Sequence, residues 1–128
     1  MINRRVVQTA LNRTRGSKKI PGLSPGCPAD NQSSVISRLI YDIFGGEILK
    51  THNKKGWHFY NRINGERFDF TKSGVSKSFQ KNYFEDIPSN TEEIINYFEM
   101  EQYSTFFMRF IREFEETVGL KNYRPCTN

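Results

Sequence analysis

The 128-residue sequence contains few cysteines and few histidines. Cys27 lies in a loop rich in proline and glycine, and Cys126 lies near the C-terminus. A disulfide framework needs several cysteines at short spacings, and a zinc site needs clustered Cys and His ligands. Because the two histidines are His52 and His58, such a site could only be assembled from scattered single ligands. We therefore expect no disulfide framework, no metal and no cofactor.

Long apolar runs are also absent. No stretch approaches the roughly 18 apolar residues that a membrane helix needs, and the N-terminal residues have no apolar stretch of secretory-signal length. Apolar residues nevertheless make up 36% of the chain, with eleven Phe and six Tyr, which is enough for a hydrophobic core. We expect one cytoplasmic domain over residues 1–128 that does not contact a membrane. The composition does not indicate its oligomeric state.

The net charge of +5 is unevenly distributed along the chain. Residues 1–20 contain six Lys and Arg but no acid, whereas residues 82–117 contain nine acids against Arg109 and Arg112. A basic N-terminal helix or arm could bind nucleic acid, but no Lys/Arg run in it exceeds two residues and no aromatic side chain is interleaved for base stacking. We prefer the interpretation that the basic and acidic halves are solvated faces that attract each other within the fold.

The strongest helical pattern lies at about residues 33–44. Its apolar residues recur at helical spacing: Val35, Ile36, Leu39, Ile40, Ile43 and Phe44. Asp30 or Asn31 would cap this helix, and Gly45-Gly46 would end it. It follows a stretch rich in proline and glycine, residues 16–31, that predicts a loop.

Helices are also predicted near both ends of the chain. Apolar spacing predicts a short helix over residues 2–14. The C-terminal helical region, residues 89–119, begins with a capping sequence at Ser89 to Glu93 and contains a longer aromatic-faced helix that Gly119 would end. Residues 72–86 show no clear period and predict a loop.

A β-hairpin is predicted over residues 57–63 and 66–71. Asn64-Gly65 is the preferred pair for a two-residue type I′ turn, and this turn places Tyr60 opposite Asp69. One face of the hairpin is mostly apolar: Trp57, Phe59, Asn61, Ile63, Phe68 and Phe70. The other face is polar: His58, Tyr60, Arg62, Arg67, Asp69 and Thr71. A short strand over 47–51 precedes the hairpin.

A possible acyl-transfer site emerges from these elements. Enzymes of this kind need a nucleophile at a helix N-terminus, a histidine within reach and a third group that orients the imidazole. Ser33 and Ser34 lie in the first turn of the central helix, and Ser33 falls on the margin of its apolar face. If the helix packs on the hairpin, His58 can approach Ser33. Asp69 is the diagonal neighbour of His58 on the polar face and could orient its imidazole. Gln32 would then be a possible oxyanion donor.

The same residues also fit ordinary structural roles. Serine at a helix start is most often a cap, and His58 could be an ordinary strand residue. Asp69 could pair with Arg67 or Arg62 instead of with the histidine. Spacing alone leaves these alternatives open.

The stretch from Gln32 to Thr71 resembles the YunG family of small bacterial proteins, which in turn is similar to papain-like cysteine hydrolases with a Cys–His–Asp order. The most specific segments are Phe-Gly-Gly-Glu-Ile-Leu and His-x-x-Asn-Arg. The resemblance implies a small papain-like domain that acts on a peptide, isopeptide or amide bond. It matches the Gln, His, Asn-Arg and Asp of the family pattern to Gln32, His58, Asn61-Arg62 and Asp69, with Gln32 and Asn61 as neighbours of the site.

The nucleophilic cysteine of the family pattern falls on Ser33. Three explanations compete: an inactive relative that binds without catalysis, a serine nucleophile, or an engineered replacement that disables the site. Cys27 as nucleophile is a fourth, but Pro28 and its loop place it away from the helix terminus.

These observations predict an α+β fold. The helix and hairpin of residues 31–71 would form the core, with the central helix packed on an antiparallel sheet between N- and C-terminal helices. The favoured function is a hydrolase or acyltransferase site at Ser33, His58 and Asp69, with a peptide or protein substrate. The alternative is a module that binds protein or nucleic acid through the basic arm and the polar hairpin face, using Tyr60, Arg62 and Arg67.

Overall fold

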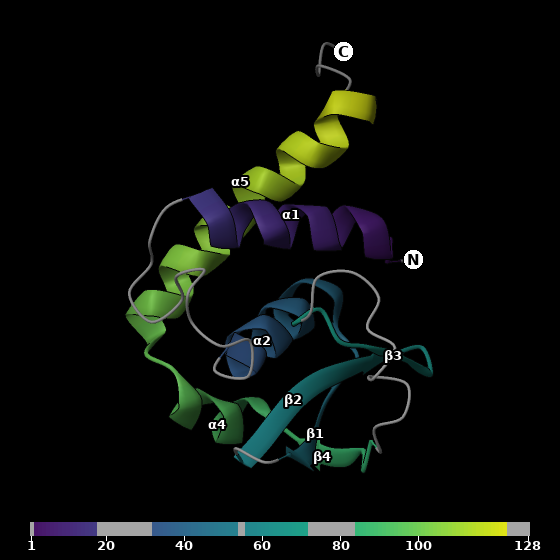
Figure 1. Cartoon of the computed structure of the whole chain (residues 1–128), viewed down its shortest axis with the longest axis vertical. Coiled ribbons are helices and arrows are strands. Elements are labelled where there is room, and N and C mark those ends of the chain that lie inside the picture. The colour runs from purple at the N-terminus through teal and green to yellow at the C-terminus, as the bar shows by residue number, and fades with distance from the viewer. Residues whose placement is uncertain (1, 18–31, 54–55, 72–83, 123–128) are drawn as a thin grey trace.

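The structure is a computed structural model that describes residues 2–17, 32–53, 56–71 and 84–122. In chain order its elements are α1 (Arg4–Ser17), α2 (Ser33–Phe44), β1 (Glu47–Asn53), β2 (Gly56–Ile63), β3 (Glu66–Phe68), β4 (Ile87–Ser89), α4 (Thr91–Ile94), the 3-10 helix η2 (Ile95–Tyr97) and α5 (Met100–Asn122). Figure 1 shows helices and sheet arranged as a small α+β fold, as the sequence predicts.

The sheet has the strand order β3-β2-β1-β4, and each neighbouring pair is antiparallel. The predicted hairpin register is confirmed, because Ile63 pairs with Glu66. The ladder is shorter than predicted, however: β3 ends at Phe68, so Tyr60 and Asp69 do not pair through their backbones. The backbone N–H of Thr71 donates instead to the Asp69 side chain. Thr71 therefore does not pair with β2 in the ladder.

Helix α2 lies between the sheet and the pair formed by α1 and α5 (Figure 1). Its residues Leu39 and Ile40 are fully buried in a core cluster that draws side chains from both neighbouring layers, including Phe110 of α5 and Phe68 of β3. Complete burial of each such side chain contributes about 1.5–3 kcal/mol. The strong apolar stripe of α2 therefore fixes this helix, and with it the position of Ser33, at the centre of the fold.

The basic helix α1 contacts acidic groups of the same chain. Arg13 lies 3.4 Å from Glu113 and 3.9 Å from Glu116 of α5, and Arg4 lies 2.7 Å from Glu66 beside the hairpin turn. The two Arg13 contacts agree with the preferred interpretation that the basic and acidic halves attract each other within the fold. The Arg4 pair joins α1 to the hairpin instead.

Several predicted boundaries differ from the structure. The N-cap position of α2 is Gln32, whose side chain makes no capping bond. The predicted cap residues Asp30 and Asn31 lie outside the described part of the chain. Helix α5 continues past Gly119, because a glycine ends a helix only where it turns left-handed and otherwise costs about 1 kcal/mol.

The predicted cap of the helix after Ser89 is confirmed, whereas the strands differ from the prediction. The side chain of Asn90 caps α4 by accepting from the backbone N–H of Glu93 at 2.8 Å, as the capping sequence predicts. Strand β4 was not predicted, and β1 extends beyond the predicted 47–51 to Asn53. Helix α1 continues to Ser17, beyond the predicted end at residue 14, so the predicted loop over 16–31 is wrong at residues 16 and 17. Residues 18–31 and 72–83, with Cys27 and Cys126, lie outside the described part of the chain. Within the described part, no helix is both long and apolar enough to span a membrane.

Candidate functional site

The His58 and Asp69 side chains form a buried pair. His58 projects from the middle of β2, and Asp69 follows the last residue of β3. The Nε2 atom of His58 lies 2.6 Å from Oδ2 of Asp69, and the two side chains are only 8% and 2% exposed. The sequence prediction that these two residues are neighbours is therefore confirmed, although the contact is made by the side chains beyond the end of the ladder.

Asp69 keeps its negative charge in this buried position. Burial raises the pKa of Asp69, but the hydrogen bond from His58, the charge of His58 and two hydrogen bonds from Thr71 together lower it below its ordinary value. The Thr71 bonds, from its N–H at 3.0 Å and its hydroxyl at 2.6 Å, both reach Oδ1. The carboxylate thus accepts from His58 on one oxygen and from Thr71 on the other.

Ser33 is the first residue of α2 and is only 1% exposed. Its Oγ accepts a hydrogen bond of 3.1 Å from the backbone N–H of Phe59, the residue that follows His58 on β2. Because Gln32 occupies the N-cap position, Ser33 does not act as the helix cap. Its hydroxyl instead joins the start of α2 to β2 beside His58.

Gln32 and Asn61, the two predicted neighbours of the site, are both 1% exposed. The side-chain amide of Asn61 donates to the carbonyl of Ser37 at 3.0 Å and so ties β2 to α2. Gln32 lies directly before Ser33 at the N-cap position. The structure therefore gives Asn61 an anchoring contact and places Gln32 next to Ser33 in the chain.

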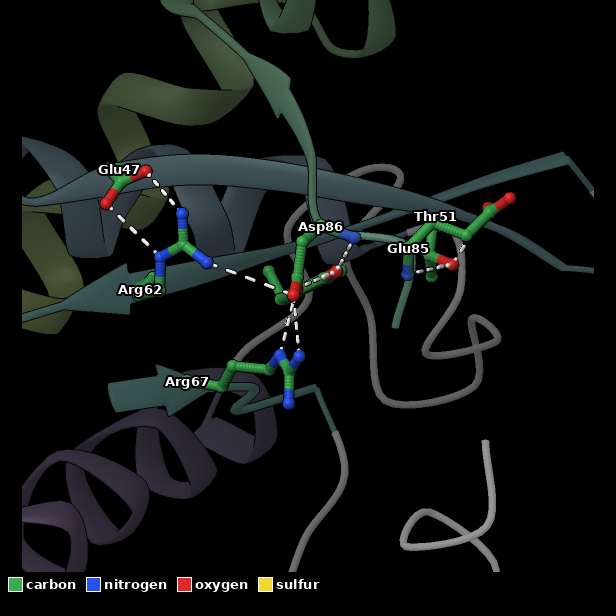
Figure 2. A network of polar contacts seen from close by, with 7 residues as sticks. Glu47, Thr51, Arg62, Arg67, Glu85 and Asp86 are labelled. Carbon is green, nitrogen blue, oxygen red and sulfur yellow. Dashed lines mark hydrogen bonds and ion pairs between the residues drawn. The ribbon is translucent and has the colours of Figure 1, made fainter. Parts of the chain in front are cut away.

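Of the remaining predicted site residues, Arg62 and Arg67 gather around Asp86 instead of around Asp69 (Figure 2). Tyr60 also contacts Asp86. Arg67 donates two hydrogen bonds, of 2.9 and 2.6 Å, to the Asp86 carboxylate, and the Tyr60 hydroxyl donates to it at 2.7 Å. Arg62 lies 3.8 Å from Asp86 and forms two bonds with Glu47. The alternative in which Asp69 pairs with Arg67 or Arg62 is therefore wrong.

The contacts in this network shift the pKa values of Asp86 and Tyr60. Hydrogen bonding from Arg67 is the largest influence on Asp86 and, with Tyr60 and the two arginine charges, lowers its pKa to about 2. Tyr60 is 1% exposed, and its burial together with the Asp86 carboxylate raises the pKa of its hydroxyl. The polar hairpin face is thus covered near Tyr60 by the segment before β4.

Thr71 and Asp86 are the polar residues with central contacts that sequence reasoning did not single out as site residues. Thr71 was placed on the polar face, but its double contact with Asp69 depends on the turn after β3. Asp86 lies in a stretch without periodicity and has a left-handed backbone, with φ of 56°. An acidic residue directly before a strand is the sequence feature that could have indicated a role for Asp86.

The contact between His58 and Asp69 and the start of α2 each have a chemical consequence. With Nε2 of His58 bonded to Asp69, proton exchange with a reactant has to occur at Nδ1. The first turn of α2 contains no acidic side chain, so the partial positive charge of its N-terminus favours negative charge near Ser33. Among the described residues, no group of three or more His, Cys, Asp and Glu side chains could hold a metal ion.

Comparison with known proteins places the chain in a family. The family model described as YunG protein matches residues 4–115. The uncharacterized protein YunG of Bacillus subtilis (strain 168) is 41% identical over 86 residues, which are 67% of this chain and 72% of that relative. No solved structure matches the chain. On the extent of the family match and the identity to this relative, the chain belongs to the YunG family.

Proposed function

We propose that Ser33, His58 and Asp69 form a papain-like acyl-transfer site that acts on a peptide or amide bond, with serine in the position of the nucleophile. The observation that carries this proposal is the buried 2.6 Å contact between His58 and Asp69, two residues that the hairpin brings together beside the start of α2. Ser33 supports it, because its hydroxyl bonds to the residue next to His58.

In the proposed reaction, Nδ1 of His58 accepts the proton of Ser33 as Oγ attacks the carbonyl carbon. Asp69 orients the imidazole and stabilises its positive charge, and the N-terminus of α2 stabilises the negative charge on the oxyanion, with Gln32 as a further donor. The imidazolium then gives its proton to the departing amine as the carbon–nitrogen bond breaks. Water or another acceptor releases the acyl group from Ser33 in the same way.

Serine makes this site less reactive than cysteine would. A thiol has an ordinary pKa of about 8.5, roughly two units above that of an imidazole, whereas a serine hydroxyl is a far weaker acid. A thiol at position 33 would therefore give up its proton to His58 much more readily. We expect the Ser33→Cys variant to reveal the chemistry of the site most clearly.

The alternative function, nucleic-acid binding by the basic arm, receives less support. Arg4 and Arg13 of α1 are engaged by acids of the same chain. Arg62 and Arg67 on the hairpin are likewise engaged, with Glu47 and Asp86. Binding to random nucleic acid that weakens steeply with added salt would favour this alternative.

The test of the acyl-transfer site is thiol alkylation. Cys27 and Cys126 are first replaced by serine, so that a single cysteine can be introduced. We expect Ser33→Cys to react with iodoacetamide at pH 7 at least about tenfold faster than a thiol of similar burial that His58 does not activate, because His58 and the helix terminus stabilise its thiolate. Adding His58→Ala removes this enhancement.

Ser34→Cys is the matched control, because Ser34 lies in the same turn of α2 and is also buried, at 4% exposed. Its alkylation rate is expected to be slow and indifferent to His58→Ala. Equal rates for the two variants, or a Ser33→Cys rate that does not depend on His58, would refute the proposed function. Circular dichroism of each variant checks that its fold is retained.

A further inference from the structure

The segment of residues 67–71, which contains Asp69, is held by hydrogen bonds within itself and by hydrogen bonds from α1. Within the segment, Thr71 donates its N–H and its hydroxyl to Oδ1 of Asp69, at 3.0 and 2.6 Å. With Oδ1 fixed in this way, the second oxygen, Oδ2, is directed at Nε2 of His58. Thr71 is only 2% exposed, so water does not compete freely for these bonds.

Helix α1 holds the same segment from the other side. Three of its polar side chains donate to backbone carbonyls of the chain between residues 67 and 71. Arg4 reaches Arg67 at 2.9 Å, Gln8 reaches Phe70 at 3.5 Å and Arg15 reaches Thr71 at 3.4 Å.

The positions of the three donors explain why they act together. Arg4, Gln8 and Arg15 follow one another at spacings of four and seven residues, which places them on one face of a helix. This face lies along the segment that follows the hairpin turn. The basic character of α1 is therefore partly used to hold this segment in place.

We propose that Thr71 is a positioning residue that fixes the Asp69 carboxylate toward His58, and that Arg15 of α1 supports it through the Thr71 carbonyl. The effect on reactivity rests on the proposed function of Ser33, whereas the effect on the His58–Asp69 contact does not. Two donors on Oδ1 leave Oδ2 as the acceptor for the proton on Nε2, and this keeps Nδ1 as the proton-accepting nitrogen.

The geometric part is tested by nuclear magnetic resonance on the protein with Ser33 unchanged. The Nε2 proton of His58, bonded to a buried carboxylate, should give a slowly exchanging low-field signal, and His52 serves as the internal reference because the chain has two histidines. In Thr71→Val, which loses the hydroxyl donor, we expect this proton to exchange with water roughly tenfold faster. Thr71→Ser should restore slow exchange.

Two further variants separate positioning from a general loss of stability. Ile94→Val lowers stability in the smaller core cluster of Ile48, Phe59 and Ile94 and should leave the exchange rate unchanged. Arg15→Gln should accelerate exchange less than Thr71→Val does, because its bond to the segment is long and leads to Asp69 only through Thr71.

A folded Thr71→Val protein with unchanged exchange would overturn the proposal. If Thr71→Val does not fold, Arg15→Gln decides: faster exchange supports the proposal, and unchanged exchange overturns it.

The part that depends on the proposed function uses the single-cysteine Ser33→Cys protein. There, Thr71→Val should lower the alkylation rate roughly tenfold, and Thr71→Ser should restore it. If the thiol shows no enhancement at all while Thr71→Val still alters the His58 proton, the proposed function fails and the positioning role stands. If His58→Ala slows the thiol and Thr71→Val changes neither measurement, the positioning role fails and the proposed function stands.

Discussion

Asp69→Asn is a nearly isosteric change that tests what the buried carboxylate does. Asp69 accepts one hydrogen bond from His58 and two from Thr71. An asparagine has one acceptor oxygen and one NH2 group, so it cannot satisfy both neighbours as they stand. If its oxygen stays with the two Thr71 donors, its NH2 group faces Nε2 of His58. His58 then has to move its proton to Nδ1.

The magnitude follows from these contacts. Hydrogen bonds to a charged group contribute about 1.5–3 kcal/mol each, compared with about 1 kcal/mol for neutral partners. Neutralising an acceptor of three bonds and changing the tautomer of His58 should therefore cost about 3 kcal/mol. For a domain of this size, that corresponds to a fall in Tm of about 10 °C.

The loss should also depend on pH. Because the folded-state pKa of Asp69 lies below its ordinary value, its ionised form stabilises the fold fully above about pH 4. This contribution is lost as the pH falls through the lower folded-state pKa. The difference in the free energy of unfolding between the two proteins should therefore be largest near neutral pH and shrink in acid.

Urea unfolding at several pH values measures the stability difference, and imidazole nitrogen resonances report the tautomer of His58. Glu66→Gln is a suitable control, because the ion pair between Arg4 and Glu66 is exposed, at 52% and 62%, and such pairs contribute at most about 1 kcal/mol. The reasoning is refuted if Asp69→Asn keeps the proton on Nε2 and destabilises no more than Glu66→Gln does.

Two further predictions concern the surroundings of the site. Gly46→Ala should destabilise the protein clearly more than Gly45→Ala in thermal unfolding: both backbones are left-handed, but an added Cβ at Gly46 would lie 2.6 Å from the carbonyl oxygen of Arg62, whereas at Gly45 it meets nothing within 4 Å. Equal losses would contradict this. Asp86→Asn should lower Tm at pH 7 because it weakens the two hydrogen bonds from Arg67. The deficit should shrink as the pH falls below about 4 and most of it should be gone near pH 2, since the folded-state pKa of Asp86 is about 2. A deficit as large at pH 2 as at pH 7 would show that charge is not its cause.

Local patterns in the sequence predict the central part of the fold. The apolar stripe and the Gly-Gly stop predict α2 with its observed bounds, and the Asn64-Gly65 turn predicts the register at Ile63 and Glu66. This register also predicts that His58 and Asp69 are neighbours. These features depend on contacts between residues close in sequence, which a pattern can capture.

The remaining features depend on competition between contacts. The strand after the turn stops early because the Asp69 side chain takes the N–H of Thr71, and no periodicity reveals that exchange. Strand β4 has only three residues, including Pro88, and owes its place to pairing with β1. The role of the basic residues of α1 likewise becomes visible only when α5 and the hairpin lie against that helix.

The most direct test of the acyl-transfer site is the energetic coupling between His58 and a thiol at position 33. In the background without native cysteines, the factor by which His58→Ala slows alkylation of Ser33→Cys is divided by the corresponding factor for Ser34→Cys. The proposed site predicts a ratio of about ten or more at pH 7, because in that site His58 activates a thiol at position 33 and not one at position 34. A ratio close to one, with all four proteins folded, would contradict it.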